Sequence, residues 1–153
     1  MEETTFVYNP DQEFIDFANY FSENYKSLKS GHYISKGNKY QVFYFRPASF
    51  KGVRVSHKTG VIEMDARLLK NDKVTPDFVF YLMIWCRVSF NLGKIQNEML
   101  VDKTAIDYYL KTGRPTKNIV LGMEASLGND FNAKTRLQNI VHVLGKETES
   151  NGN

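Results

Sequence analysis

The sequence predicts an α+β fold: an N-terminal helix, a small twisted sheet of about four strands, and a C-terminal half of four helices. Three observations support this prediction. Apolar residues recur every three or four positions before Gly31, as on one face of a helix. Short segments rich in β-branched and aromatic residues then follow, separated by turn residues. From Thr75 the helical spacing returns and continues to Leu144.

The length of 153 residues is the usual size of one domain. We therefore expect a single domain over residues 1–145, followed by a polar tail over residues 146–153. The first helix is predicted to begin at Asn9 and Pro10, with Asn9 as its cap, and to end at Gly31. Strands are predicted over residues 32–35, 40–45, 52–56 and 61–64, with turns at 36–39 and 57–60.

Four helices are predicted in the C-terminal half, over residues 75–91, 97–111, 116–127 and 130–144. The first of them begins at Thr75–Pro76, a typical helix start, and is apolar on nearly every side. We therefore expect this helix in the middle of the domain, with Trp85 buried. The last helix is predicted to end at Leu144, before Gly145.

Charge and cysteine content argue against several classes of function. The net charge is only +3 and the basic residues are scattered among acidic ones, whereas nucleic-acid binding normally shows as a clustered basic surface. One cysteine rules out an internal disulfide and a cysteine-based zinc cage. The acidic N-terminus has no signal-peptide pattern, and the longest apolar run is about half a membrane span. We expect a soluble protein that is not secreted through a cleaved signal peptide.

The segment over residues 97–109 resembles gluzincin-type metallopeptidases, in the stretch where a glutamate supplies the third zinc ligand. The resemblance assigns that role to Glu98, the support of a ligand histidine to Asp102, and close helix packing to Ala105. These residues would share one helical face. Residues 75–91 resemble the motif-bearing helix of that family, and residues 132–140 its closing helix. The resemblance covers residues 61–144 and implies a zincin-like fold.

The family's zinc motif, His-Glu-x-x-His, is degenerate in this chain. In the register set by Glu98, residues 85–89 read Trp-Cys-Arg-Val-Ser, without either histidine or the general-base glutamate. A catalytic zinc needs about three protein ligands around an open position. We therefore expect no bound metal, no cofactor and no catalytic residue. The degenerate family site comprises Trp85, Cys86, Ser89, Glu98 and Asp102.

Ordinary structural roles are also open to these residues. Glu98 and Asp102 are either remnants of the family site, paired with Arg87 or Arg46, or carboxylates favoured by the helix dipole. Cys86 is expected to be an inert core residue. We expect no chemical role for the histidines and a solvated face for the basic residues of the last helix. The histidines are His32, His57 and His142, and the basic residues are Lys134, Arg136 and Lys146.

A peptidase-like fold that has lost its catalytic residues predicts a pseudoenzyme whose surface binds other proteins, because a fold does not fix function. We expect a structural protein that binds other proteins in a multi-subunit assembly, in several copies and without a membrane. Its surface is expected at the termini and at turns 36–39 and 57–60. Thirteen asparagines against six alanines are typical of an AT-rich genome. They favour a phage of gut bacteria as the source, and a virion (head, neck or tail) or the cytoplasm as the location.

Two alternatives of other classes stay open. One is a residual metal-independent hydrolase that uses Cys86 or an acidic pair. The other is a nucleic-acid or small-ligand binding module that uses the exposed rings of Tyr108 and Tyr109 with lysines. Turnover of unfolded casein would distinguish the first, and binding that weakens steeply with salt would distinguish the second.

Overall fold

A mixed four-stranded sheet and five helices make up the part of the chain that this computed structural model describes, which confirms the predicted combination of elements. The described residues are 10–27, 31–45, 53–65, 67, 70–93, 97–127 and 131–150. The strands are β1 (Gly31–Ile34), β2 (Gln41–Phe45), β3 (Val53–Val55) and β4 (Ile62–Asp65). The helices are α1 (Gln12–Asn24), α3 (Pro76–Leu92), α4 (Glu98–Lys111), α5 (Lys117–Leu127) and α6 (Phe131–Ser150).

The strands lie in the order β1-β2-β4-β3. β1 and β2 form an antiparallel hairpin, β2 and β4 run parallel, and β3 returns antiparallel to β4. All four predicted strands are present within about two residues of their expected bounds. The two predicted turns use the residues that tolerate a left-handed backbone, with φ of 62° at Asn38 and 79° at Gly60.

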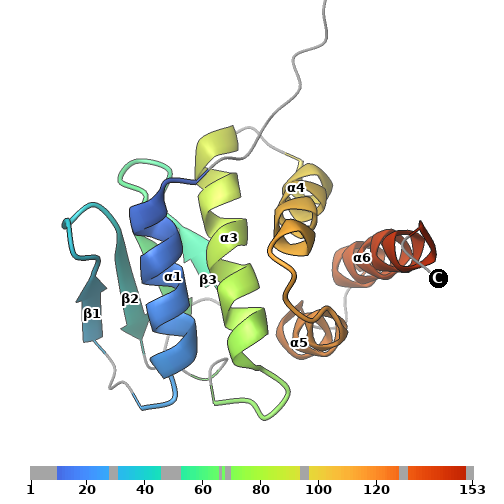
Figure 1. Cartoon of the computed structure of the whole chain (residues 1–153), viewed down its shortest axis with the longest axis horizontal. Coiled ribbons are helices and arrows are strands. Elements are labelled where there is room, and N and C mark those ends of the chain that lie inside the picture. Colours follow the sequence, from blue (N-terminus) through green and yellow to red (C-terminus); the bar gives the residue numbers. More distant parts are fainter. Residues whose placement is uncertain are drawn as a thin grey trace, which may run out of the picture.

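α1 lies beside α3, and its aromatic face packs on the β1–β2 hairpin (Figure 1). The predicted bounds of α1 were wrong at both ends. Its cap is Asp11, whose carboxylate accepts the Phe14 N–H at 2.9 Å, whereas the predicted cap, Asn9, lies outside the described residues. The helix ends at Asn24 and not at Gly31, because the N–H and the hydroxyl of Ser27 both bond to the Asn24 carbonyl in a turn.

α3 is the central element, as predicted, and contacts α1, β3, α4 and α5. It begins at the Thr75 cap, whose hydroxyl accepts the Phe78 N–H, and it ends at Gly93 with φ of 89°. Its side chains are buried along nearly the whole length. Trp85 is a partial exception, because it packs against the core but is only half-buried.

α4, α5 and α6 lie on the side of α3 away from β1 (Figure 1). The predicted helices match α4 and α5 closely, but α6 continues through Gly145 to Ser150, beyond the predicted end at Leu144. Gly145 has no atom within 4 Å of an added Cβ, so it is an exposed helical glycine and not a helix stop. The predicted loose tail therefore begins no earlier than residue 151, which lies outside the described residues.

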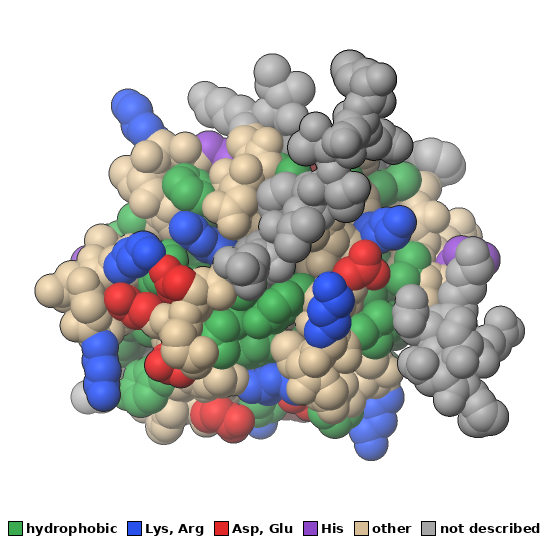
Figure 2. Space-filling model, turned by 45° about the horizontal axis from the view of Figure 1, so that its top comes forward, with side chains coloured by type: hydrophobic (Ala, Val, Ile, Leu, Met, Phe, Trp, Pro, Cys, Tyr) green, Lys and Arg blue, Asp and Glu red, His purple; other side chains and the backbone are tan. Residues whose placement is uncertain are grey.

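Charges of both signs are mixed on the molecular surface. On the face shown in Figure 2, basic and acidic side chains lie next to one another around patches of hydrophobic ones. None of the described helices is long and apolar enough to cross a bilayer.

Candidate functional site

Three of the residues in the predicted degenerate site meet at one place, between α3, α4 and α6. Asp102 on α4 is at the centre. One of its carboxylate oxygens accepts the indole N–H of Trp85 on α3 at 2.7 Å, and the same oxygen accepts Arg136 Nη2 at 2.8 Å. Its other oxygen accepts Arg136 Nε at 2.9 Å. We call Trp85, Glu98, Asp102 and Arg136 the polar cluster.

The centre of the polar cluster is shielded from water. Asp102 is 3% exposed and Arg136 is 9% exposed, so their two-point salt bridge lies at low dielectric. Burial lowers the pKa of the Arg136 guanidinium, but the hydrogen bonds and charge of Asp102 outweigh burial and leave that pKa above its ordinary value. Arg136 also lies over the Trp85 ring, 5.5 Å from its centroid.

Glu98 forms the outer edge of the cluster. Its carboxylate lies 3.4 Å from Arg136 Nη1, and its side chain is half-exposed. Tyr81, one helical turn before Trp85, forms the inner edge. The Tyr81 hydroxyl is buried and has no hydrogen-bond partner among the described residues. Burial raises its pKa far above the ordinary value, and the nearby charge of Asp102 raises it further.

Arg136 is the partner that sequence reasoning missed. The predicted partners were Arg87 and Arg46, but the Arg87 guanidinium lies over the rings of Tyr40 and Phe90, 4.8 Å from each centroid. Arg46 lies outside the described residues. Arg136 was predicted to be solvated, which is wrong. A signal was present, because Arg136 lies in the segment that resembles the closing helix of the gluzincins.

Cys86 and Ser89, at two other positions of the degenerate motif, lie outside the polar cluster. Cys86 is fully buried in the core, and burial raises the pKa of its thiol well above the ordinary value. Ser89 is 1% exposed, and its hydroxyl and carbonyl oxygens both lie 3.2 Å from Nε2 of His57. This contact of His57 was not predicted. Neither side chain is placed to attack a substrate, because both are covered.

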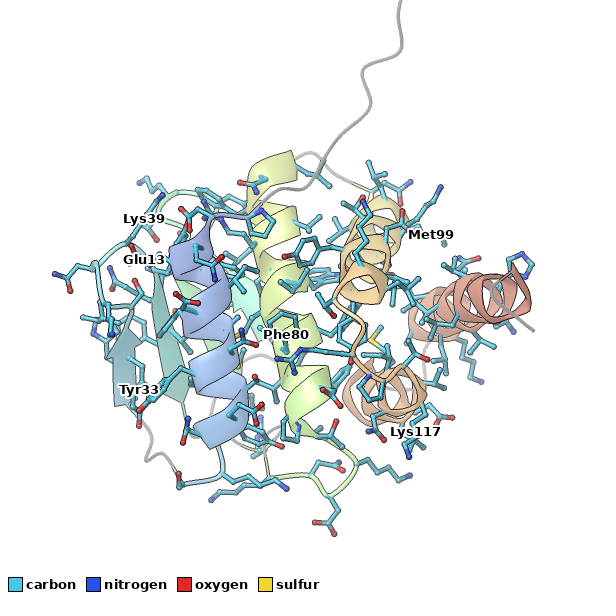
Figure 3. The ribbon with its side chains drawn as sticks, in the orientation of Figure 1. Glu13, Tyr33, Lys39, Phe80, Met99 and Lys117 are labelled. Atoms are coloured by element: carbon cyan, nitrogen blue, oxygen red, sulfur yellow. The ribbon has the colours of Figure 1, made fainter. Side chains whose placement is uncertain are left out.

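The two tyrosines named for the alternative binding module are not exposed. The Tyr109 ring is fully buried against Phe80, which Figure 3 labels on α3, with the centroids 6.4 Å apart. The Tyr109 hydroxyl donates to the Pro115 carbonyl at 2.6 Å. Burial raises the pKa of the Tyr109 hydroxyl. Tyr108 is half-buried, so the predicted pair of exposed rings does not exist.

The other two histidines are exposed. His32 stacks on Phe43, with the centroids 4.1 Å apart, and its Nε2 lies 2.7 Å from the side-chain oxygen of Gln41. His142 lies on the exposed side of α6. In the part of the chain that the structure describes, no three His, Cys, Asp or Glu side chains converge in a way that could hold a metal ion.

Comparisons of this chain with protein-family models, with curated proteins and with solved structures found no match. The chemistry of the polar cluster therefore rests on its own geometry: a buried arginine balances two carboxylates, and a tryptophan N–H completes the bonding of one of them.

Proposed function

We propose that this chain is a non-catalytic interaction protein, built on a gluzincin-type metallopeptidase fold in which a salt bridge takes the place of the zinc site. Its partners are other proteins in a multi-subunit assembly. The proposed setting is a phage virion, for which the composition is the support.

The bonding of Asp102 carries the proposal. The resemblance gives this residue the task of supporting a ligand histidine, and here it accepts the N–H of Trp85, which stands at the first histidine position. Glu98, at the position of the third zinc ligand, faces the Arg136 guanidinium. Arg136 thus supplies the positive charge beside two carboxylates that a zinc ion would supply in a peptidase.

The remaining motif positions support the same conclusion. Cys86 stands where the general base would be, and its buried thiol with a raised pKa stays protonated at neutral pH. Ser89 stands at the second histidine position and lies against His57. None of these side chains is a group that could activate a water molecule for attack on a peptide bond.

Metal content and turnover test the proposal directly. After mild dialysis the protein should carry well under one zinc per chain, and a chelator should leave its melting temperature unchanged. Unfolded casein should not be cleaved, with or without added zinc. A melting temperature that a chelator lowers by several degrees, or casein turnover that Glu98→Ala or Cys86→Ala removes, contradicts the proposal.

Rebuilding the motif tests the resemblance to gluzincins. The triple variant Trp85→His, Ser89→His, Arg136→Met restores both histidines and frees Glu98, so a folded sample should bind one zinc. The control is Gln138→His, which forms an exposed pair with His142 one turn away but has no third ligand. After circular dichroism shows that both variants are folded, we expect the rebuilt site to bind zinc at least about ten-fold more tightly. Equal affinities would contradict the resemblance.

A further inference from the structure

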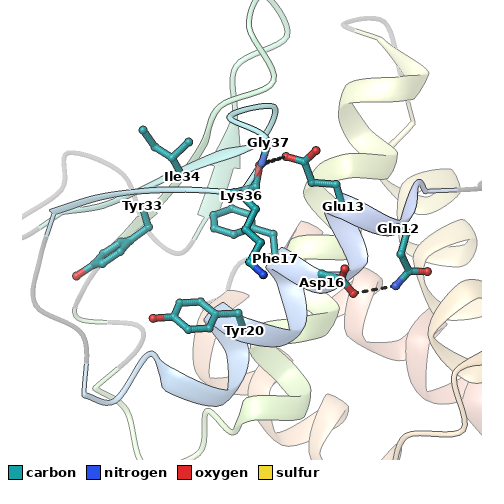
Figure 4. A pocket seen from close by; sticks show the side chains of 10 residues that line it. Gln12, Glu13, Asp16, Phe17, Tyr20, Tyr33, Ile34, Lys36 and Gly37 are labelled. Atoms are coloured by element: carbon teal, nitrogen blue, oxygen red, sulfur yellow. Dashed lines mark hydrogen bonds between the residues drawn. The ribbon is translucent and has the colours of Figure 1, made fainter.

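A groove of about 810 Å³ runs between α1 and β1 (Figure 4). These elements lie on the side of α3 away from α4 and α6, which carry most of the polar cluster (Figure 1). Rings of Phe17, Tyr20 and Tyr33 line it, and Tyr20 is 55% exposed. Glu13 and Asp16 line the groove from α1. A large apolar hollow with a few charged groups is typical of a binding site.

β1 forms one wall of the groove and is an edge strand of the sheet. Ser35 donates its N–H to the Tyr40 carbonyl at 2.8 Å, which fixes the alternation of hydrogen-bonded pairs along the hairpin. Tyr33 therefore bonds inward to β2, and the backbone N–H and C=O groups of His32 and Ile34 point outward. No strand among the described residues pairs with that side of β1.

We propose that this groove binds an extended segment of a partner protein, which adds to β1 as an antiparallel strand. Two partner residues would exchange backbone hydrogen bonds with His32 and Ile34. The partner residue between them lies opposite Tyr33 and directs its side chain to the α1 face of the sheet, between Phe17 and Tyr20. The groove therefore selects an aromatic or long aliphatic side chain at this position.

The charged side chains that line the groove are Glu13, Asp16 and Lys36, so two carboxylates outnumber one cation and favour a basic residue two positions earlier in the partner. In an antiparallel pair that residue lies opposite Ser35, on the α1 face and at the end of the groove that carries Glu13 and Asp16. The carboxylate of Glu13 is occupied by the Ser35 hydroxyl and the Gly37 N–H, whereas within the described part of the chain Asp16 bonds only to the exposed amide of Gln12. Asp16 is the carboxylate open to a partner cation.

A second copy of this chain fits the groove less well than a basic segment. Antiparallel pairing of two β1 strands about Tyr33 would place Gly31 of the other copy opposite Ser35, and so no cation beside Asp16. The recognised sequence is therefore basic-x-apolar in an extended partner segment.

This inference rests on the proposed function for its choice of a protein partner. The zinc experiments test the polar cluster and the peptide experiments test the groove, so that either proposal can fail without the other.

Fluorescence anisotropy with a labelled peptide, Lys-Val-Phe-Val-Thr, tests the proposal on the full chain. We expect saturable binding that weakens at least about ten-fold when glutamate replaces the lysine, when alanine replaces the phenylalanine, or when the two valine nitrogens are methylated. If the peptide binds equally tightly after all three changes, the proposal is overturned. The charge, the groove and the strand edge would then contribute nothing to the affinity.

Variants of the protein locate the peptide. Ile34→Pro removes only an outward N–H, because Ile34 and Gln41 are not a hydrogen-bonded pair. This variant should therefore fold and fail to bind the peptide. The control, Ile34→Ala, should bind the peptide almost as tightly as the wild type. Asp16→Lys should reverse the charge preference of the peptide, and Glu23→Lys, on the same helix but outside the groove, should not. Wild-type affinity in a folded Ile34→Pro protein would refute strand addition. If the wild type self-associates as its concentration rises and Ile34→Pro does not, β1 pairs with a second copy of the chain. That result would also refute the proposal.

Discussion

Replacing Asp102 with asparagine should reveal how much the polar cluster contributes to stability. Asparagine keeps the size and can still accept the Trp85 N–H. It leaves the Arg136 guanidinium in the protein interior, where the half-exposed Glu98 is its one remaining counter-charge among the described residues. Both charged bonds, at 2.8 and 2.9 Å, are lost or inverted. Each such bond is worth about 1.5–3 kcal/mol, and breaking one side of a buried ion pair costs about 3–5 kcal/mol. We expect a loss of about 3–5 kcal/mol.

Urea denaturation followed by the fluorescence of Trp85 measures this loss, provided that the slope of the transition stays the same. Asp107→Asn is the matched control, because Asp107 lies on the same helix and takes part in none of the bonds of the cluster; it should change stability by less than about 0.5 kcal/mol. The double variant Asp102→Leu, Arg136→Met removes both charges and should be close to wild type. A loss below about 1 kcal/mol for Asp102→Asn would refute the reasoning, because the pair would then behave as a solvated one.

Three further predictions concern a hydroxyl, a glycine and a carboxylate. Tyr81→Phe should raise the melting temperature, since its hydroxyl has no partner among the described residues, whereas Tyr109→Phe should lose about 1 kcal/mol with its hydrogen bond. Gly122→Ala should lose about 1–3 kcal/mol, because its Cβ would overlap a buried ring of α3, whereas Gly145→Ala, which meets no atom, should gain up to about 1 kcal/mol. A hydrogen bond from a lysine holds the pKa of Asp11 at about 2, below the ordinary 3.8, so this carboxylate stabilises the fold above pH 3.8, and its contribution disappears as pH falls through 2. The stability difference between wild type and Asp11→Asn, measured by urea titration, should therefore shrink towards zero over that interval; a difference that is constant with pH would contradict it.

The sequence was sufficient for the elements whose signals are local. Thr75 caps α3 and Gly93 ends it because a side-chain oxygen and a positive φ act within one turn of the chain. Tertiary contacts decided the rest. The pairing of Asp102 with Arg136 spans 34 positions, so no helical spacing could reveal it, and Arg136 looked like a solvated residue of a basic helix. The end of α6 was missed because an exposed glycine only weakens a helix and does not have to end it.

The resemblance to gluzincins grouped some residues that are neighbours in the fold, but it did not predict the arginine that they contact. It grouped Trp85, Glu98 and Asp102, which do lie together. Ser89 and Cys86 belong to the same motif by position, yet Ser89 faces His57 and Cys86 faces the core. Helical spacing gives the direction of a side chain, but the neighbouring elements that meet it are set by the packing of the whole domain.

The distance along the chain between Asp102 and Arg136 has a consequence for synthesis. α1, the sheet and α3 are translated first, and α4 follows. Trp85 on α3 and Asp102 on α4 are therefore both present before α6 is made. The carboxylate then has no cation until α6 leaves the ribosome and docks. A nascent chain that stops before residue 136 would lack this cation and would leave uncovered the sides of α4 and α5 that contact α6, and exposed apolar surface makes an incomplete chain prone to aggregation and dependent on chaperones. Docking of α6 therefore closes the salt bridge and covers α4 and α5 in the same step.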